Sequence, residues 1–415
     1  MKKQKMNMYD YIIIGGGVTG ITLCKKLREK GIDNILVLEK SDEPGGLCRT
    51  KEIDGHILDI GGGHFFHTKH QEIFDYVFKY LPENEFNYYK RVSKIEMGET
   101  TIDYPIESNV WQLPMEEQIE YLISIIRNGQ SLNRKEPENY EEWVRWKLGD
   151  KICDAYMIPY NTKLWGVEPK EMDIDWLYKI PNVDVREVLK YSLERKQDVN
   201  KFPAHIHFYY PKKEGFGQIV KALVKDELSF IKCGCEVTKL RYKEGNWIVN
   251  DVYAAKRIIN TTPWNDLYRA LGCPAEIASA IQKIKYNRIV VSLFEKDYDV
   301  DWHWKYIPDP SKAHHREFYI HNYAEDSKKN GIYLETGIKR FKEKKMPVGS
   351  KASIVDFYTD AAYPIPVTGH AQAIREILDY YRPMGLYGVG RWGQHEYQNA
   401  DVSMHEAIKF VDSLP

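Results

Sequence analysis

The amino-terminal stretch YDYIIIGGGVTGITLCKKLREKGIDNILVLEK alternates between short apolar runs and a segment with helical periodicity. Tyr11 to Ile14 and Ile35 to Leu38 are continuous apolar runs, which is typical of strands buried on both faces of a sheet. Between them, residues 21–30 repeat apolar positions at helical spacing, and Gly31 follows as a signal for the helix end. The pattern therefore predicts a βαβ unit.

The turn after the first strand carries candidate chemistry. Gly15, Gly17 and Gly20 have the spacing G-x-G-x-x-G, and Glu39 closes the second strand. In such a turn the first glycine allows a tight bend, the second lets the backbone approach a pyrophosphate, and the third lets helix and strand pack closely. The helix N-terminus supplies N–H groups and partial positive charge, and the acid can accept both ribose hydroxyls. The unit therefore predicts a dinucleotide site.

The next stretch favours FAD over NAD as the dinucleotide. NAD-binding folds usually continue with another helix, whereas here Gly45, Gly46 and Arg49 precede the strand-like segment IDGHILDIGGG. The pattern E-K-x-x-x-x-G-G-x-x-x-T resembles the FAD-binding superfamily of amine oxidases, protoporphyrinogen oxidases and UDP-galactopyranose mutases.

Chains of that superfamily return to the FAD domain later in the sequence, and two segments resemble such returns. The first is CEVTKLRYKEGNWIVNDVYAAKRIINTTP, and the second is GLYGVGRWGQHEYQNADVSMHEAIKF, in which a helix is expected after Asp401 with its N-terminus toward the flavin. The residues that we expect to bind FAD are Gly15, Gly17, Gly20, Glu39, Gly46, Arg49, His64, Val237, Gly390, Arg391, Asp401 and Ser403.

Along most of its length the chain resembles the UDP-galactopyranose mutases in particular. The segments that carry the resemblance occur in the family's order: GGGHFFHT, DYPIESN, YNTKLWGVEPKEMDIDWL, YPKKEGFGQIVKAL, WKYIPDP, HREFYIHNY, AYPIPV and GRWGQHEYQNAD. The resemblance implies substrate contacts from Asn161, Trp165, Lys179, Tyr306, Arg316, Asn322, Tyr323, Tyr363 and Tyr397.

Two positions depart from the family's pattern. Lys179 stands where the family has a mobile-loop arginine, so the charge is kept but bidentate phosphate recognition is lost, and Arg186 could take that role instead. Glu107 stands where some mutases have Gln near the nucleotide base. The identity of the nucleotide sugar stays open on these grounds.

The resemblance implies an isomerase that interconverts pyranose and furanose forms of a nucleotide sugar, UDP-galactose or a related UDP or dTDP sugar. In the family, reduced FAD attacks the anomeric carbon through N5, and a flavin–sugar adduct opens and recloses the ring. Such an enzyme needs a reductant such as NAD(P)H and serves galactofuranose and cell-surface polysaccharide biosynthesis. The alternative is an FAD-dependent oxidoreductase of the amine oxidase or protoporphyrinogen oxidase type, which shares the FAD framework.

The candidate catalytic residues are His64, Arg391 and Arg288. The three glycines before His64 permit positive φ and a close approach of the backbone to the flavin, so this histidine is expected to hydrogen-bond and tune the reduced ring. A purely structural histidine is the alternative. A metal site made of His64, His67 and His70 is disfavoured because no carboxylate or cysteine cluster accompanies them, and we expect no metal.

We expect an α/β chain with a Rossmann-like FAD-binding domain, a helical domain and an antiparallel-sheet substrate domain. The FAD-binding domain is expected from residues 7–90, 203–265 and 350–415. Residues 112–200 are rich in helical periodicity, as in MEEQIEYLISIIRN and YEEWVRWKLGDKI, and are expected to form the helical domain with the mobile loop. Residues 91–110 and 266–349 are expected to form the substrate sheet.

Composition adds only exclusions. The chain of 415 residues has 59 Lys and Arg against 60 Asp and Glu, so its balanced charge gives no reason to propose nucleic acid as a partner. No apolar run approaches the ~20 residues of a membrane span. The six cysteines are scattered, which is typical of free thiols in a reducing cytoplasm. We expect a cytoplasmic enzyme that could form a homodimer.

Overall fold

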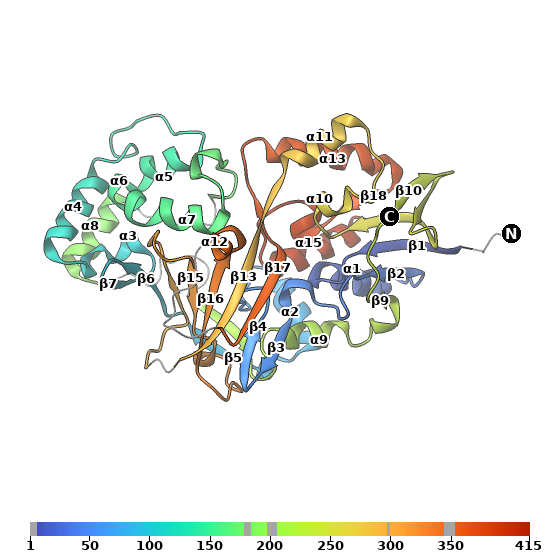
Figure 1. Cartoon of the computed structure of the whole chain (residues 1–415), viewed down its shortest axis with the longest axis horizontal. Coiled ribbons are helices and arrows are strands. Elements are labelled where there is room, and N and C mark those ends of the chain that lie inside the picture. Colours follow the sequence, from blue (N-terminus) through green and yellow to red (C-terminus); the bar gives the residue numbers. More distant parts are fainter. Residues whose placement is uncertain (1–5, 178–183, 197–205, 297–298, 344–352) are drawn as a thin grey trace.

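The computed structural model describes all residues except 1–5, 178–183, 197–205, 297–298 and 344–352. Its described part is an α/β structure with two seven-stranded sheets. Figure 1 shows the first sheet on the right among helices, the second sheet in the lower middle, and a layer of helices at the left end.

The first sheet contains the strands that the opening pattern predicts. Its order is β10 (Leu240–Lys243), β11 (Asn246–Val249), β12 (Tyr253–Asn260), β1 (Asn7–Ile14), β2 (Ile35–Leu38) and β9 (Ile231–Lys232), with β18 (Leu386–Gly388) also beside β12. The pairs β12–β1, β1–β2, β2–β9 and β12–β18 are parallel, and β10–β11 and β11–β12 are antiparallel.

Helices cover both faces of this sheet. On one face, Tyr11 and Ile13 pack in a core with α1 (Val18–Glu29) and α15 (Ala400–Asp412). On the other, Ile12 and Ile14 pack in a core with α10 (Trp264–Leu267), α11 (Ala275–Lys283) and α13 (His370–Tyr381). Both faces of β1 are buried, so Tyr11 to Ile14 are all apolar. A strand with one face in solvent would instead alternate apolar and polar residues.

The second sheet stands beside the first. Its order is β17 (Val355–Ile365), β13 (Lys285–Glu295), β16 (Gly331–Gly337), β15 (Arg316–Phe318), β14 (Trp304–Tyr306), β6 (Ser93–Met97) and β7 (Thr100–Asp103). Its pairs are antiparallel except β14–β6, which is parallel, so the expected antiparallel sheet is mixed at this one place.

The helical layer contains α3 (Ile106–Asn109), α4 (Met115–Ile126), α5 (Tyr140–Leu148), α6 (Asp150–Ile152), α7 (Ile158–Trp165) and α8 (Val185–Glu194). Helix α6 continues into α7 through a π-helical turn, Cys153–Met157. Pro159 lies just after this turn and has no N–H to donate into it, which fits a local change of helix type.

Smaller elements join these units. Strands β3 (Thr50–Ile53) and β4 (His56–Asp59) form one hairpin, and β5 (Phe86–Lys90) pairs with β8 (His207–Pro211). The remaining helices are α2 (Gln71–Tyr80), α9 (Gly217–Val224), α12 (Ile338–Glu343) and α14 (Gly390–Gly393).

Two segments lie elsewhere than the expected boundaries placed them. Helix α11 falls in the range assigned to the substrate sheet, but its apolar face is buried on the first sheet, with Ile277 and Ile281 in the same core as Ile12. Strand β17 falls in the range assigned to the FAD-binding domain, but it pairs with β13 in the second sheet. In both cases long-range packing, which local periodicity does not report, decides the position.

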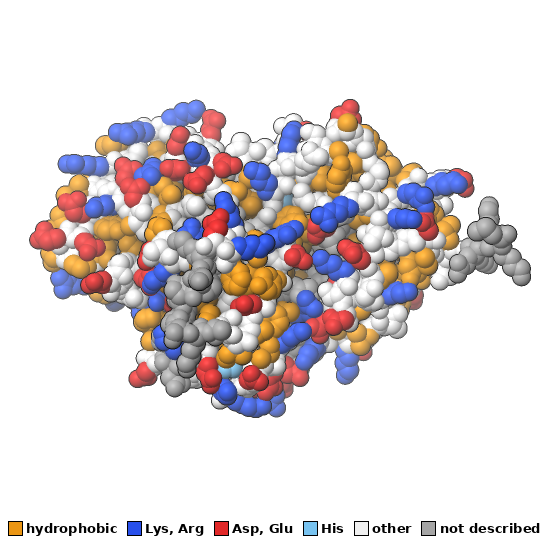
Figure 2. Space-filling model, in the orientation of Figure 1, with side chains coloured by type: hydrophobic (Ala, Val, Ile, Leu, Met, Phe, Trp, Pro, Cys, Tyr) orange, Lys and Arg blue, Asp and Glu red, His pale blue; other side chains and the backbone are white. Residues whose placement is uncertain are grey.

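The surface agrees with the balanced composition. Basic and acidic side chains are interspersed over the face shown in Figure 2, without a field of one sign. Among the described helices, none combines the length and the apolar character that crossing a membrane would require.

The third glycine of the nucleotide turn gives a test of the packing. A Cβ on Gly20 would lie 2.0 Å from the backbone oxygen of Gly15. Gly20→Ala should therefore lower the free energy of unfolding by ~1–3 kcal/mol, although alanine is favoured by about 1 kcal/mol inside a helix. Chemical denaturation measures the change. The matched control is Gly272→Ala, where a Cβ meets nothing within 4 Å. Equal stability of the two variants would contradict the close approach of α1 to the Gly15 backbone.

Candidate active site

A large cavity lies between the two sheets and is called the main cavity here. Its volume is about 1840 Å³, more than the ~300–1,000 Å³ of a typical small-molecule site, so a dinucleotide and a second ligand can be accommodated together. Gly15, Glu39 and Thr261 line it at the carboxyl ends of β1, β2 and β12. This edge of a parallel sheet is the usual position of a nucleotide.

The glycine turn has the geometry that the sequence predicts for a dinucleotide. Gly15 has a φ of 102°, which strongly favours glycine. The buried Glu39 carboxylate accepts hydrogen bonds from the backbone N–H groups of Gly16, at 2.7 Å, and Ser41, at 2.8 Å. Each carboxylate oxygen keeps a further lone pair, so both can still accept from a ribose.

Most of the other expected FAD contacts also line the main cavity. They are Gly17, Gly46, Arg49, His64, Val237, Arg391, Asp401 and Ser403. Gly390 does not line it, and a Cβ there would lie 2.5 Å from the Thr19 side chain, so this glycine serves packing. The first turn of α15 faces the cavity through Ala400, Asp401 and Ser403, as expected from the sequence. The residues present therefore fit FAD.

The glycine–histidine loop places His64 at the cavity wall. Only Gly62 of the three glycines has a positive φ, 106°. The other two are required by close contacts, because a Cβ on Gly61 would lie 2.2 Å from the Leu47 oxygen and one on Gly63 would lie 2.1 Å from the Phe318 ring. The loop is thus fixed by its close contacts with Leu47 and Phe318 and by the positive φ of Gly62.

The His64 imidazole is held in its neutral form. Burial lowers its pKa to about 4, and the positive charge of Arg391 adds to this effect. Its Nδ1 is buried and has no hydrogen-bond partner, while its ring lies against Phe216 with centroids 5.2 Å apart. A neutral ring at the cavity wall is suited to a hydrogen bond with a bound cofactor.

Arginine and tyrosine side chains gather at the far part of the main cavity. Arg391 lies over the rings of Tyr363, at 5.2 Å, and Tyr397, at 5.3 Å, and its guanidinium donates to the Ala362 carbonyl. Arg316 and Tyr306 line the cavity beside them. Such a cluster of charge-assisted donors is suited to phosphate oxygens.

A buried glutamate, which the sequence reasoning missed, organises this cluster. Glu335 on β16 is 1% exposed; it accepts from the Tyr363 hydroxyl, lies 3.2 Å from His315 Nε2, and its Oε2 is 3.8 Å from Arg316 Nε. Burial raises the pKa of Glu335, but the charges of Arg316 and His315 and the hydrogen bonds from His315 and Tyr363 outweigh it and hold the pKa at about 2. No local pattern marks this position, because GIYLETG reads as an ordinary buried strand.

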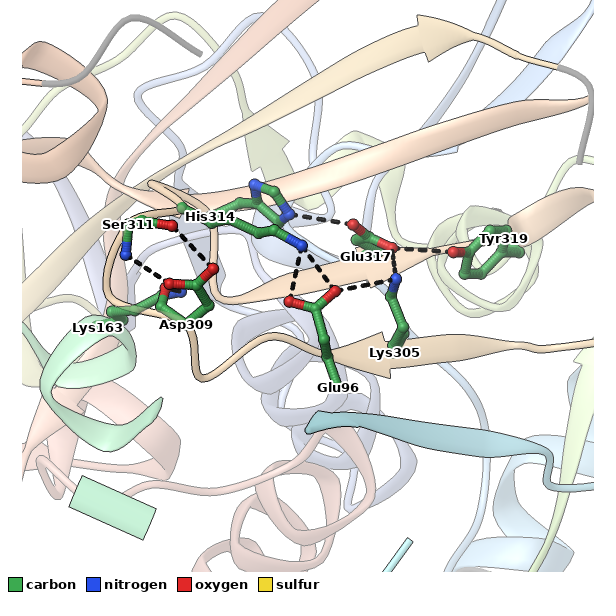
Figure 3. Close-up of polar contacts among 9 residues, drawn as sticks. Glu96, Lys163, Lys305, Asp309, Ser311, His314, Glu317 and Tyr319 are labelled. Atoms are coloured by element: carbon green, nitrogen blue, oxygen red, sulfur yellow. Dashed lines mark hydrogen bonds and ion pairs between the residues drawn. The ribbon is translucent and has the colours of Figure 1, made fainter. Parts of the chain in front are cut away.

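The strand pair that carries Arg316 and Tyr306 is fixed from its other face (Figure 3). Lys305 pairs with Glu317 across β14 and β15, with Nζ 3.0 Å from Oε2. Glu317 also contacts His314 at 3.1 Å and the Tyr319 hydroxyl at 2.9 Å. Because neighbouring strand residues point to opposite faces, this network holds the hairpin without entering the cavity.

Comparison with known proteins bears on this geometry. Residues 13–81 match the family model described as an NAD(P)-binding Rossmann-like domain. A UDP-galactopyranose mutase from Mycoplasma genitalium is 23% identical over 261 residues, 61% of each chain, and a dTDP-fucopyranose mutase from Escherichia coli is 24% identical over 180 residues, 42% of this chain and 46% of that one. The chain thus matches less than two thirds of the length of these relatives.

A solved structure extends the likeness to the whole fold. The crystal structure of a reduced UDP-galactopyranose mutase superposes with a TM-score of 0.84 and 21% identity, covering 98% of this chain and 95% of the other. The chain thus shares the fold of this mutase and is similar in sequence to UDP-galactopyranose and dTDP-fucopyranose mutases. The resemblance inferred from the sequence segments is confirmed, as is the α/β fold with a Rossmann-like domain.

A second and smaller cavity opens from the arginine–tyrosine cluster; it is called the side cavity here. It has a volume of about 180 Å³ and shares Tyr104, Tyr306, Arg316 and Tyr397 with the main cavity. Asn161 and Trp165 of α7 line the side cavity, and the indole Nε1–H donates to Asn161 Oδ1 at 3.0 Å. Trp165 is fully buried, with its ring edge-on to Tyr397 at 5.3 Å.

Arg91 is a further cavity residue that sequence reasoning missed. Its guanidinium donates to the Tyr306 hydroxyl at 3.0 Å and lies over the rings of Tyr104 and Trp304. It follows β5 in sequence, where an exposed arginine would be unremarkable, so only the tertiary structure brings it to the main cavity beside Tyr306.

Several expected substrate residues are not brought to the cavities. Asn322 donates to the carbonyls of Val300 and Trp302, and Tyr323 packs edge-on against Tyr210 and Phe208 in the core. Neither lines the main cavity or the side cavity described above, because this Asn-Tyr pair closes the turn after β15.

The remaining candidates divide between the cavity rim and other regions. Arg288 lines the main cavity but is exposed on β13, where a hydrogen bond with Tyr286 raises its pKa. It therefore lies at the rim instead of beside His64. Lys179 lies outside the described residues, and Arg186 is exposed on α8.

The three histidines considered as a metal site in the sequence, His64, His67 and His70, are not among the described residues whose ligand atoms gather closely. Among the described residues, the group whose ligand atoms lie within 4.8 Å of one another is Asp173, Asp175 and His370. None of these three lines either cavity.

Glu335 gives the site a testable pH dependence of stability. Since its pKa is lowered from 4.5 to about 2, the ionised carboxylate stabilises the fold above pH ~4.5, and this contribution, ~3 kcal/mol in full, is lost as the pH falls toward 2. Glu335→Gln should therefore be less stable than the parent at neutral pH, with the difference shrinking by about 1 kcal/mol near pH 3.5.

Urea denaturation at both pH values measures this difference, with the exposed Glu276→Gln as the matched control. A difference between parent and Glu335→Gln that does not change with pH would contradict the assignment of a low pKa to this carboxyl group.

Proposed function

We propose that the protein is an FAD-dependent nucleotide-sugar mutase that interconverts the pyranose and furanose forms of UDP-galactose or a related UDP or dTDP sugar. One observation carries the proposal: the same cavity extends from a dinucleotide-binding glycine turn to a buried cluster of arginine and tyrosine side chains. The names of the relatives, which refer to UDP-galactopyranose and dTDP-fucopyranose, support this substrate class.

Residues of the first sheet would hold the cofactor. The glycine turn at Gly15 and Gly17, with the N-terminus of α1 behind it, would take the pyrophosphate, and Glu39 would take a ribose. His64 and Arg391 would lie beside the ring system. When bound and reduced by a donor such as NAD(P)H, the flavin supplies the nucleophile and electron source that this isomerisation requires.

The protein's own part is to hold the diphosphate while it leaves and returns. Arg316 and Arg391 are placed to stabilise the negative charge that develops on the phosphate oxygens, and burial strengthens this interaction. Burial also raises the pKa of Tyr397, so its hydroxyl stays protonated and can donate. Tyr363 differs from the sequence expectation, because its proton is already donated to Glu335; it supports the cluster from behind.

His64 would act on the cofactor side of the site. With a pKa of about 4, the imidazole remains neutral throughout the physiological range. A neutral ring offers one donor and one acceptor and adds no positive charge beside Arg391. Its role would be to orient the cofactor by a hydrogen bond from the ring at the cavity wall.

The arginine–tyrosine cluster also separates this proposal from an oxidoreductase with the same FAD framework. Arg316 already has the Glu335 carboxylate as its counter-charge, whereas Arg391 is half-buried and has no ion pair among the described residues, so a substrate without phosphates would leave the Arg391 charge unpaired. Buried charge is costly unless it is paired. The cluster therefore favours a substrate that brings a diphosphate with it.

The first prediction from this proposal concerns the cofactor. The purified protein should be yellow and release FAD on mild denaturation. Two of the described cysteines line the main cavity: Cys235, whose backbone N–H donates to the Glu39 carbonyl at the ribose end, and Cys48, which is a poor nucleophile because burial raises the pKa of its thiol to about 12. Absorbance of the filtrate after denaturation measures the released flavin. Flavin that stays with the precipitated chain would contradict non-covalent binding.

The second prediction separates the two sides of the site. Arg316→Ala should weaken UDP binding by about 10- to 150-fold, because a charge-assisted contact worth ~1.5–3 kcal/mol is lost, and Arg316→Lys should lie between that variant and the parent. His64→Ala should leave UDP binding within about twofold, since it lies on the cofactor side.

Titration calorimetry with UDP gives all three affinities, with the exposed Arg382→Ala as the control for loss of one positive charge. If Arg316→Ala binds UDP as tightly as the parent does, the phosphates are bound elsewhere and the substrate is not a nucleotide sugar held in this cavity.

A further inference from the structure

Three side chains that can ligate a metal lie together outside both cavities: Asp173, Asp175 and His370. A ring nitrogen of His370 and one carboxylate oxygen of each aspartate all lie within 4.8 Å of one another. Three such atoms fit within a circle of radius 4.8/√3, so some point lies within about 2.8 Å of each. Zinc binds histidine nitrogen and aspartate oxygen at ~2.0–2.2 Å, so side-chain shifts of less than ~1 Å would bring all three atoms to one ion.

The three residues come from two parts of the fold that meet at this place. The two aspartates follow the short helical turn Pro169–Glu171 of the helical layer, whereas His370 is the first residue of α13, which packs on the first sheet. A backbone hydrogen bond joins the two segments, because the Asp173 N–H donates to the Pro366 carbonyl at 2.7 Å. The fold itself therefore brings the carboxylates to the imidazole.

His370 has the hydrogen bond that is usual for a metal-binding histidine. Its Nδ1 lies 2.9 Å from the Val367 carbonyl oxygen, which can only accept, so Nδ1 carries the proton and Nε2 keeps its lone pair. A bond of this kind to a backbone carbonyl fixes the tautomer of histidines that ligate zinc. His370 is 8% exposed, and none of the described residues forms a hydrogen bond with its Nε2. An acceptor on so buried a side chain, left without a donor, indicates a bound cation.

The two carboxylates also lack a positive partner within the described part of the chain. Neither Asp173 nor Asp175 forms an ion pair with a described Lys or Arg; Lys285 contacts the neighbouring Glu171 instead, with Nζ 3.6 Å from Oε2. Two carboxylates brought close together repel each other, and a cation between them removes that repulsion. Because Asp175 is exposed, an ion can enter from solvent and water can complete its coordination.

We propose that Asp173, Asp175 and His370 bind a zinc ion, with water as the fourth ligand, and that this ion joins the helical layer to α13. One imidazole nitrogen with two carboxylate oxygens suits Zn²⁺, whereas Ca²⁺ and Mg²⁺ prefer oxygen ligands. The site lines neither cavity, so the ion stabilises the fold and takes no part in the reaction proposed above. The stabilisation arises because the three ligands are brought together only in the folded chain.

The proposal predicts tight binding of one zinc ion per chain by the flavin-loaded protein after treatment with a chelator. Asp175→Asn should weaken this binding by at least about 100-fold, because loss of a partner behind a ligand already costs about 10- to 100-fold. Asp175 is exposed, so this variant should fold like the parent. His370→Asn should have the same effect on zinc, while its amide keeps a donor for the Val367 carbonyl. The matched control is Asp379→Asn, at an exposed position of the same helix.

Calorimetric titration with zinc chloride gives the affinity and stoichiometry, and thermal unfolding with and without zinc measures the stabilisation. The parent and Asp379→Asn should bind one ion and unfold at a higher temperature with zinc, whereas Asp175→Asn and His370→Asn should show neither effect. Absence of tight binding in the parent overturns the proposal, and so does equal affinity in the parent and Asp175→Asn, because zinc would then bind elsewhere. An equal rise in unfolding temperature with calcium chloride overturns zinc as the ion, and no rise with zinc overturns its role in the fold.

Discussion

A single buried carboxylate, Glu335, is the constraint on which the site depends. It lies on a central strand of the second sheet and contacts His315, Arg316 and Tyr363, which come from neighbouring segments of the chain. Its negative charge keeps Arg316 ionised and in place although both are largely removed from water. The Arg316 guanidinium is thereby held in position before any ligand binds. Such preorganisation is the condition for strong electrostatic stabilisation of a developing negative charge.

The cavity around this cluster exists only where distant parts of the chain meet. The nucleotide turn comes from β1, the histidine loop follows β4, the arginine hairpin is β14–β15, and Arg391 follows β18. The Lys305–Glu317 pair fixes the hairpin on the face away from the cavity. The positions of the cavity residues therefore depend on the packing of both sheets. A substitution that shifts a strand of either sheet would also shift the cavity residues that follow it.

Local spacing allowed the nucleotide-binding end to be predicted in detail. The βαβ unit, the tight turn at Gly15 and the Glu39 carboxylate depend on residues close in sequence, so their pattern is sufficient. Glu335 and Arg91 could not be predicted, because their burial and partners arise from long-range strand pairing and their local sequence is ordinary. The same limit explains why Asn322 and Tyr323, which are expected substrate contacts, lie at the turn after β15 and away from the two cavities.

The central claim is that one cavity binds a reduced flavin and a nucleotide sugar for an isomerisation without net electron transfer. The most direct test is to incubate the holoenzyme with UDP-galactofuranose, after chemical reduction or in the oxidised state, and to separate the products by chromatography. The account predicts UDP-galactopyranose from the reduced protein alone, with many turnovers for each reduction of the flavin. Equal conversion by oxidised protein, or an oxidised sugar product formed with stoichiometric consumption of reductant or oxygen, would contradict it.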